Sequence, residues 1–165
     1  MASAAQSLSA AENTRVKLTK RHRVGIVVSS YYNEITYKLR DAAIETLKQS
    51  GIREKDLFVV EAPGTFELPL AAQMLYKSKR LNAVICLGCV IKGETDHDKY
   101  INHSVADELM RLGTANNAPF VFGVLTPNNR QQAEDRAGGK HGNKGVECAN
   151  AALQMLALKE KLAKK

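Results

Sequence analysis

The sequence has no long apolar run, only three cysteines, and no excess of charge of either sign between residues 24 and 158. A membrane-spanning helix needs about 20 consecutive apolar residues, so we expect no membrane partner. Residues 1–20 contain no uninterrupted apolar segment of signal-peptide length. Three cysteines without regular spacing do not predict a disulfide framework. The sequence therefore predicts a protein of the reducing cytoplasm.

The excess of basic over acidic residues lies at the two ends of the chain. The formal net charge is +7, of which residues 1–23 carry +4 and residues 159–165 carry +3. Nucleic-acid-binding folds usually have a basic stripe with interleaved aromatic side chains. Since this domain has none, we expect no nucleic-acid partner. Basic tails that bind RNA are a weaker alternative, which predicts salt-dependent binding that is lost when both ends are removed.

Length and composition indicate one compact domain. The chain has 165 residues, of which 44% are apolar and 25% are charged, as in an ordinary globular protein. A second catalytic domain is excluded by this length. Because the first residues are small and polar, we assign residues 1–22 to an arm that is flexible or bound to a partner. Residues 23–165 form the single domain.

Strand-like and helix-like stretches alternate along this domain. The β-branched run at residues 24–28 is typical of a strand buried on both faces of a parallel sheet. Asn33 is the expected N-cap of the helix that follows, and Gly51 its stop. Four repeated strand–helix units predict a right-handed parallel α/β sandwich. The other expected strands are 57–61, 83–90 and 120–125, and the other expected helices are 66–79, 97–116, 129–137 and 144–162.

Ligands of parallel sheets bind beyond the carboxyl ends of the strands, so the segments after the strands are the candidates for chemistry. Cys86 and Cys89 have the spacing of a redox or zinc pair, but they lie along a buried strand without a second pair, which favours structural thiols. The loop at residues 92–97 has a glycine and a hydroxyl residue at a helix start. It can offer N–H groups to an anion, or it is a capping turn with Thr95 or Asp96 as the N-cap.

Several side chains in these segments indicate chemistry, each weakly. His97 stands at a helix start, where the helix dipole disfavours the imidazolium and leaves a neutral ring suited to proton transfer. Arg136 precedes a glycine-rich turn, where its guanidinium can hold a phosphate or complement the helix end. Tyr31 and Tyr32 can stack on a flat ring or cap the core. The weaker histidine candidates are His103 and His141.

Four sequence blocks occur in a specific order. They are Pro-Gly-Thr-Phe-Glu-Leu-Pro at residues 63–69, Gly-Cys-Val-Ile-Lys-Gly-Glu-Thr-Asp-His at 88–97, Phe-Gly-Val-Leu-Thr at 122–126, and Arg-Ala-Gly at 136–138 with Gly-Asn-Lys-Gly at 142–145. Together they resemble the lumazine synthase family of riboflavin biosynthesis. The similarity runs essentially without gaps from about Arg23 to Leu158.

The resemblance implies a fold, a reaction and a set of site residues. The implied fold is a three-layer αβα sandwich with a four-stranded parallel sheet of flavodoxin-like topology. The substrates are 5-amino-6-(D-ribitylamino)uracil and 3,4-dihydroxy-2-butanone 4-phosphate, a four-carbon sugar phosphate, and the products are 6,7-dimethyl-8-ribityllumazine, phosphate and water. No metal or organic cofactor is implied. His97 is the implied proton shuttle, and Arg136 the implied phosphate ligand, helped by Thr95 and the backbone of residues 93–95. The other implied substrate-binding residues are Tyr31 as the aromatic plate, Phe66 and Glu67 for the ring and ribityl chain, Thr65, Cys89, Val90, Ile91 and Glu94 around the pocket, and Phe122 and Lys144 from a neighbouring subunit.

The resemblance also implies assembly, because sites in this family lie between adjacent subunits of a pentamer. We therefore expect a homopentamer or a larger assembly. The turn at residues 138–142 has no insertion and resembles that of the shell-forming members, which makes an icosahedral shell the larger assembly to expect. A carrier or shell protein that binds flavin-like heterocycles without turnover is the alternative from another class. The presence of both His97 and Arg136 favours the enzyme.

Four positions in two segments depart from the family pattern. Tyr31 stands where the family usually has Phe or Trp, and Tyr32 stands where asparagine is common, so either tyrosine can be the stacking ring. Asp98 and Lys99 replace the aromatic and acidic residues that commonly follow the histidine, although Tyr100 is retained. The charges around His97 therefore differ from the usual pattern.

Overall fold

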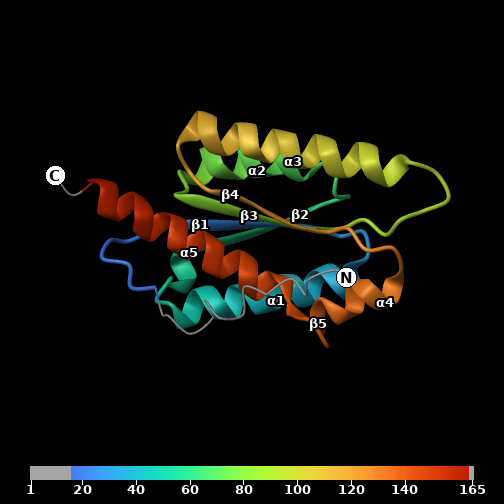
Figure 1. Ribbon diagram of the computed structural model, residues 1–165. Helices are drawn as coiled ribbons and strands as arrows, with labels where there is room; N and C mark the ends of the chain where they lie inside the picture. Colours follow the sequence, from blue (N-terminus) through green and yellow to red (C-terminus); the bar gives the residue numbers. More distant parts are fainter. Residues whose placement is uncertain (1–15, 164–165) are drawn as a thin grey trace, which may run out of the picture.

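A parallel four-stranded sheet is the middle layer of the structure, a computed structural model that describes residues 16–163 (Figure 1). Its strands are β1 (Val24–Ser29), β2 (Leu57–Ala62), β3 (Ala83–Cys89) and β4 (Phe120–Leu125). They lie in the order β2-β1-β3-β4, and all three neighbouring pairs are parallel. The predicted sheet, with its four strands and its flavodoxin-like order, is confirmed.

The two central strands are buried along their whole length. Every residue of β1 and β3 is buried, which matches the continuous apolar character of both segments. Val24 pairs with Leu57 on one side and with Ala83 on the other. The edge strand β2 differs, because Val59 and Val60 are exposed.

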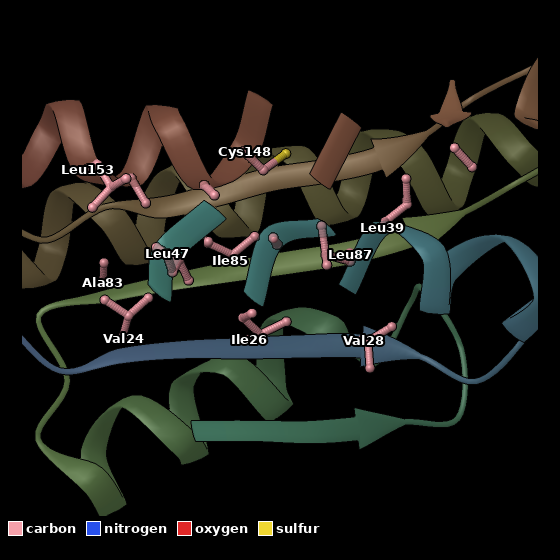
Figure 2. Packing of buried hydrophobic residues seen from close by; sticks show 14 of the residues in the cluster. Val24, Ile26, Val28, Leu39, Leu47, Ala83, Ile85, Leu87, Cys148 and Leu153 are labelled. Atoms are coloured by element: carbon pink, nitrogen blue, oxygen red, sulfur yellow. The ribbon is translucent and has the colours of Figure 1, made fainter. Parts of the chain in front are cut away.

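Helices cover both faces of the sheet (Figure 1). Helices α2 (Leu68–Lys79) and α3 (His97–Asn116) lie on one face, and α1 (Asn33–Gln49), α4 (Arg130–Asp135) and α5 (Lys144–Ala163) lie on the other. Within residues 16–163, no helix combines the length and the hydrophobicity needed to cross a membrane. The core between the sheet and α1 and α5 is shown in Figure 2, where the labelled residues are Val24, Ile26, Val28, Leu39, Leu47, Ala83, Ile85, Leu87, Cys148 and Leu153.

The start of α1 differs from the prediction. Asn33 is the first helical residue, and the N-cap is Tyr32, whose backbone is left-handed with φ 57° and ψ 44°. The predicted stop at Gly51 is confirmed: its φ is +94°, and its N–H donates to the carbonyl of Lys48 at 3.0 Å. Helix α2 begins at Leu68, two residues later than expected, because the residues before it form a turn in which the N–H of Leu68 donates to the carbonyl of Thr65.

The glycine-rich turn between the last two helices contains a small antiparallel hairpin. Its strands are β5 (Ala137–Gly139) and β6 (Gly142–Asn143). Gly138 and Gly142 have φ of +104° and +76°, values that a residue with a Cβ adopts at a cost. Helix α4 accordingly ends at Asp135, before the predicted end at Ala137, which enters the hairpin instead.

The segment before β1 is held by the last helix. Both carboxylate oxygens of Glu160, on α5, accept hydrogen bonds from the backbone N–H of Thr19, and one also accepts from the N–H of Lys20. Leu18 packs against the core between the sheet and α1. The division of the chain at residue 22 stays a prediction, and residues 1–15 of the expected arm lie outside the described residues.

Candidate active site

Four loops meet at the carboxyl edge of the sheet, on the right of Figure 1. They follow β1 to β4 at residues 30–32, 63–67, 90–96 and 126–129. Because all four strands are parallel, the loops share one edge, where ligands of such sheets bind. The sequence predicted these four segments as the places for chemistry, and the structure brings them together.

The first two loops carry two exposed aromatic rings. Tyr31 is 64% exposed and Phe66 is 60% exposed. Ser30 links the loops, since its N–H donates to the carbonyl of Ala62 at 2.9 Å and its hydroxyl to the carbonyl of Pro63 at 3.3 Å. The rings therefore project from neighbouring strand ends whose backbones are tied together.

Thr65 and Glu67 lie on either side of Phe66 in different environments. Thr65 is 6% exposed and packs against Gly88 of β3, where a Cβ would stand 2.6 Å from the threonine hydroxyl. Glu67 is exposed, and its carboxylate lies over Gly64. Glycine at position 88 thus lets the loop after β2 approach the end of β3 closely.

The loop after β3 continues alongside the loop after β4. The N–H of Val90 donates to the carbonyl of Leu125, and the N–H of Lys92 donates to the carbonyl of Pro127, both at 2.9 Å. Val90 and the neighbouring Ile91 are half-buried. From Lys92 onward the loop is exposed, and no atom lies within 4 Å of the position that a Cβ on Gly93 would take.

His97 is the first residue of α3, and its side chain is exposed. Its backbone N–H donates to the hydroxyl of Thr95 at 3.4 Å. Asp96 is the N-cap by position but makes no side-chain cap hydrogen bond, and its carboxylate pairs with Lys99 at 2.9 Å. The capping turn and the open loop are therefore both present. Glu94 is exposed beside them.

Asp98, next to His97, has a buried carboxylate oxygen, Oδ1, for which the described residues supply no hydrogen-bond partner. A buried polar oxygen without a donor is uncommon in proteins. This buried carboxylate oxygen of Asp98 therefore lies one residue from His97, in a turn that also carries Asp96 and Lys99.

A second group of polar side chains surrounds a cavity of about 590 Å³ beside the β5–β6 hairpin. Arg136 follows α4, and its carbonyl accepts from the N–H of Lys144 at 2.9 Å, which ties the hairpin closed. The ammonium of Lys144 lies 2.6 Å from the carboxylate of Glu147. Four side chains of the lining are cationic or can become so, which suits a phosphate group. They are Arg136, Lys140, His141 and Lys144.

The sequence did not select Lys140 and gave His141 little weight. Both face the cavity because the hairpin turns the chain back on itself, with the N–H of His141 donating to the carbonyl of Asp135 at 2.8 Å. Glycines stand on both sides of Lys140, in the pairs Gly138-Gly139 and His141-Gly142. These glycines were the signal in the sequence for such a turn.

The expected proton shuttle and the expected phosphate ligand lie on opposite faces of the sheet. His97 begins α3, which covers the same face as α2, whereas Arg136 follows α4, which lies on the face of α1 and α5 (Figure 1). The lining of the cationic cavity contains Arg136 and Lys144 but not His97. Within one chain, the expected proton shuttle and the expected phosphate ligand therefore do not share a pocket.

The three cysteines are free and buried, as expected for structural thiols. Burial raises the pKa of Cys86, and it raises the pKa of Cys89 and of Cys148 to about 12. Since the reactive form of cysteine is the thiolate, Cys89 can line the site only as a small apolar group. Within the described residues, no cluster of three or more His, Cys, Asp or Glu is arranged to hold a metal ion.

A family model described as 6,7-dimethyl-8-ribityllumazine synthase matches residues 21–160. The chain belongs to this family. A protein of Cytophaga hutchinsonii that carries the same name is 47% identical over 157 residues, which cover 95% of this chain and 98% of that protein. A protein of Phocaeicola vulgatus with this name is 43% identical over 164 residues, or 99% and 98% of the two chains.

Membership in the lumazine synthase family confirms the resemblance drawn from the four sequence blocks. The chain is accordingly an enzyme of the transferase class, and its reaction is the formation of 6,7-dimethyl-8-ribityllumazine in riboflavin biosynthesis. Its substrates are small molecules.

Proposed function

We propose that the chain condenses 5-amino-6-(D-ribitylamino)uracil with 3,4-dihydroxy-2-butanone 4-phosphate at a site completed by a second copy of itself. One copy contributes Tyr31, Phe66, Glu67 and His97, and the next contributes the cationic cavity around Arg136. The observation that carries this arrangement is the separation of His97 and Arg136 on opposite faces of the sheet.

Two different apolar surfaces at opposite edges of the sheet support the assembly. A groove of about 730 Å³ follows the β4 edge between α3 and α5. At the other edge, exposed apolar side chains lie on β2 and α2. Because the surfaces differ, each copy can join the next head to tail, and the same contact repeats around a closed ring when the rotation between copies closes. The groove includes Met110, Phe122, Met155, Leu158 and Leu162, and the other surface includes Val59, Val60, Leu70 and Met74.

The same ring of copies brings together aromatic side chains that lie far apart within one chain. Phe122 is on the edge strand β4, and Phe66 follows the opposite edge strand β2. Three strand spacings of about 4.8 Å put these edges roughly 14 Å apart. Docking the β4 edge of one copy on the β2 edge of the next lets Phe122 close the pocket around Tyr31 and Phe66. The family resemblance sets the expected number of copies at five.

The proposed roles follow from the chemistry of the reaction. An amine attacks a ketone, water leaves to form an imine, phosphate is eliminated, and a second nitrogen closes the ring. These steps need two oriented substrates and repeated proton transfer, which one imidazole can supply. His97 is exposed at the open loop, where it can move protons, while the guanidinium of Arg136 holds the phosphate as it becomes a leaving group.

The remaining candidates surround the pyrimidine and the phosphate. The exposed ring of Tyr31 stacks on the pyrimidine, and Phe66 and Glu67 hold the ring and its ribityl chain. Thr95 and the open backbone at Gly93 help to bind the phosphate. The others, Thr65, Cys89, Val90, Ile91, Glu94 and Lys144, line the site. Three buried free thiols support our proposal that the enzyme works in the cytoplasm.

The first experiment follows lumazine absorbance and phosphate release with both substrates. General acid–base catalysis contributes roughly 100-fold or more, so His97→Ala lowers kcat by about that factor. Hydrogen bonds to charged groups contribute roughly 1.5–3 kcal/mol each, so Arg136→Ala lowers kcat/KM by about 100-fold or more. The matched controls are His103→Ala and Arg111→Ala, both exposed on α3. An assembled wild type that binds the pyrimidine without turnover would instead indicate the carrier.

A second experiment tests whether the site is shared. The His97→Ala and Arg136→Ala proteins are unfolded, mixed in equal amounts and refolded together. In a closed ring, about one quarter of the interfaces then contain both intact halves, so activity returns to about one quarter of the wild type. A site within one chain predicts no recovery. A monomer by light scattering at micromolar concentration would refute the assembly.

A further inference from the structure

The backbone of Tyr32 is unusual for a tyrosine. Among the described residues, three that are not glycine have positive φ: Tyr32, Arg80 and Asn117. Arg80 and Asn117 end helices, where a left-handed residue is common. Tyr32 stands at the start of α1, where extended backbone is usual. A bulky side chain in this conformation is strained, so its presence needs a compensating role.

The surrounding hydrogen bonds hold this conformation firmly. The carbonyl of Tyr32 accepts from the N–H of Ile35 at 2.9 Å and from that of Thr36 at 3.0 Å. The hydroxyl of Thr36 donates to the carbonyl of Ser29 at 2.6 Å. On the other side of Tyr31, the N–H of Ser30 donates to the carbonyl of Ala62. The turn is thus pinned at both ends by groups other than the Tyr32 side chain.

The Tyr32 side chain does nothing for the cap itself, because it makes no hydrogen bond to the first turn of α1. Asparagine would suit this position better, since its side chain caps helices and it tolerates left-handed backbone. What tyrosine adds is therefore its ring. That ring is half-buried and packs against the core between the sheet and α1.

The ring of Tyr32 contacts the ring of Tyr31. Their centroids are 4.7 Å apart, and their planes meet at 71°, an edge-to-face arrangement. The inner ring is fixed by the core, whereas the outer ring of Tyr31 is 64% exposed. The contact supports Tyr31 from the protein side and leaves the rest of its ring open to the site.

We propose that Tyr32 is a positioning residue, whose ring holds Tyr31 in the orientation that stacks on the pyrimidine substrate. The inference rests on the proposed function, in which Tyr31 is the aromatic plate. Tyr32 does not touch the substrate and acts through Tyr31. A plate that is already ordered loses less conformational freedom when the pyrimidine binds, so the pyrimidine binds more tightly.

The test compares Tyr32→Asn with Tyr32→Phe. An edge-to-face aromatic pair is expected to change affinity by about 3- to 10-fold. Tyr32→Asn therefore raises the Kd and KM for the pyrimidine by that factor, while the KM for the sugar phosphate and kcat stay within about two-fold. Its thermal midpoint is equal to or above that of the wild type, because asparagine accepts the backbone. Tyr32→Phe keeps the ring and matches the wild type in binding.

A double-variant cycle separates positioning from a structural role. Once Tyr31→Ala has removed the plate, adding Tyr32→Asn changes the Kd for the pyrimidine no further, because Tyr32 acts through Tyr31. The proposal is overturned if Tyr32→Asn leaves the pyrimidine Kd unchanged, if both KM values rise together with a loss of stability, or if Tyr31→Ala itself has no effect. Absence of turnover in the wild type would contradict the proposed function. The tyrosine pair can still be tested in that case, because calorimetry measures binding of the pyrimidine alone.

Discussion

Nε2 of His22, in the segment before β1, lies 2.7 Å from a carboxylate oxygen of Glu160 near the end of α5, and both side chains are buried. The same carboxylate accepts from the hydroxyl of Thr19 at 2.6 Å and from the backbone N–H groups of Thr19 and Lys20. Burial by itself would raise the pKa of Glu160, but the hydrogen bonds from Thr19, His22 and Lys20 outweigh it and lower the pKa to about 2. The carboxylate is therefore charged at neutral pH, and both of its oxygens accept hydrogen bonds.

Glu160→Gln replaces one acceptor oxygen with an NH₂ group that must face a donor. Leaving buried polar groups unpaired costs about 1–3 kcal/mol, and a loss of about 2 kcal/mol lowers the thermal midpoint of a chain of this size by about 4–8 °C. Glu45→Gln, at an exposed position of α1, is the control. Equal midpoints for the two variants, measured by circular dichroism, would contradict the anchoring role.

The contribution of Glu160 also depends on pH. Its pKa in the folded protein is about 2, below the ordinary 4.5, so its stabilisation is complete above pH 4.5 and is lost as pH falls toward 2. The difference in unfolding free energy between the wild type and Glu160→Gln should therefore shrink over this window. Urea unfolding at several pH values measures it. The pKa values of Asp56 and Glu108 are also lowered by arginine neighbours. Both carboxylates are present in the two proteins, so their contributions cancel in the difference between the unfolding free energies.

Gly145→Ala tests the packing of α5 on α1. A Cβ at this position would stand 1.9 Å from the backbone carbonyl oxygen of Leu39, which the helices can relieve only by moving apart. Overpacking of this kind costs about 1–3 kcal/mol or more. At about 2–4 °C per kcal/mol for a chain of this size, we expect a midpoint lower by at least about 2–4 °C, or an insoluble protein. Gly93→Ala, which meets no atom within 4 Å, should fold normally; similar melting of both variants would argue against the close approach.

The thiols should not react in the folded protein. Burial raises the pKa of Cys89 and of Cys148 to about 12 and also raises that of Cys86, so almost no thiolate is present at pH 8. A chromogenic disulfide reagent should detect no thiol in the native enzyme and all three after denaturation. A cysteine that reacts at the rate of a free thiol before unfolding would show that Cys86 and Cys89 are not structural.

The fold was predictable because its determinants are local. The β-branched run at Val24–Val28 and the apolar segment at Ala83–Cys89 carry the signature of buried parallel strands, and they form the centre of the sheet. The cap of α1 was not predictable in this way. Asn33 is the better cap by intrinsic preference. The hydroxyl of Thr36 donates to the carbonyl of Ser29 at the end of β1, and its N–H donates to the carbonyl of Tyr32, which fixes Tyr32 in the cap position instead.

The site was predictable only in part. The loops after β1 to β4 follow from topology, and the sequence placed the aromatic, acidic and histidine candidates in them. The cationic cavity depends on the β5–β6 hairpin, whose turn uses the positive φ of Gly138 and Gly142. Its strands are too short to show the alternation of apolar and polar residues by which a strand is predicted from sequence. That Lys140 joins Arg136 there, and that His97 lies on the other face of the sheet, are consequences of three-dimensional packing.

The bond between Thr19 and Glu160 joins residues that are 141 positions apart in the chain. At a synthesis rate of roughly 5–20 residues per second, the ribosome needs about 7–28 s to travel from one to the other. Through all of that time the segment before β1 lacks the carboxylate that binds Thr19 and Lys20, and among its carboxylate contacts it has the pairing of Arg21 with Asp56. A product that terminates before codon 160 never gains this contact, so its backbone at Thr19 and Lys20 stays without the acceptor that holds it in the finished chain. Proteases can then tell truncated chains from finished ones at these residues.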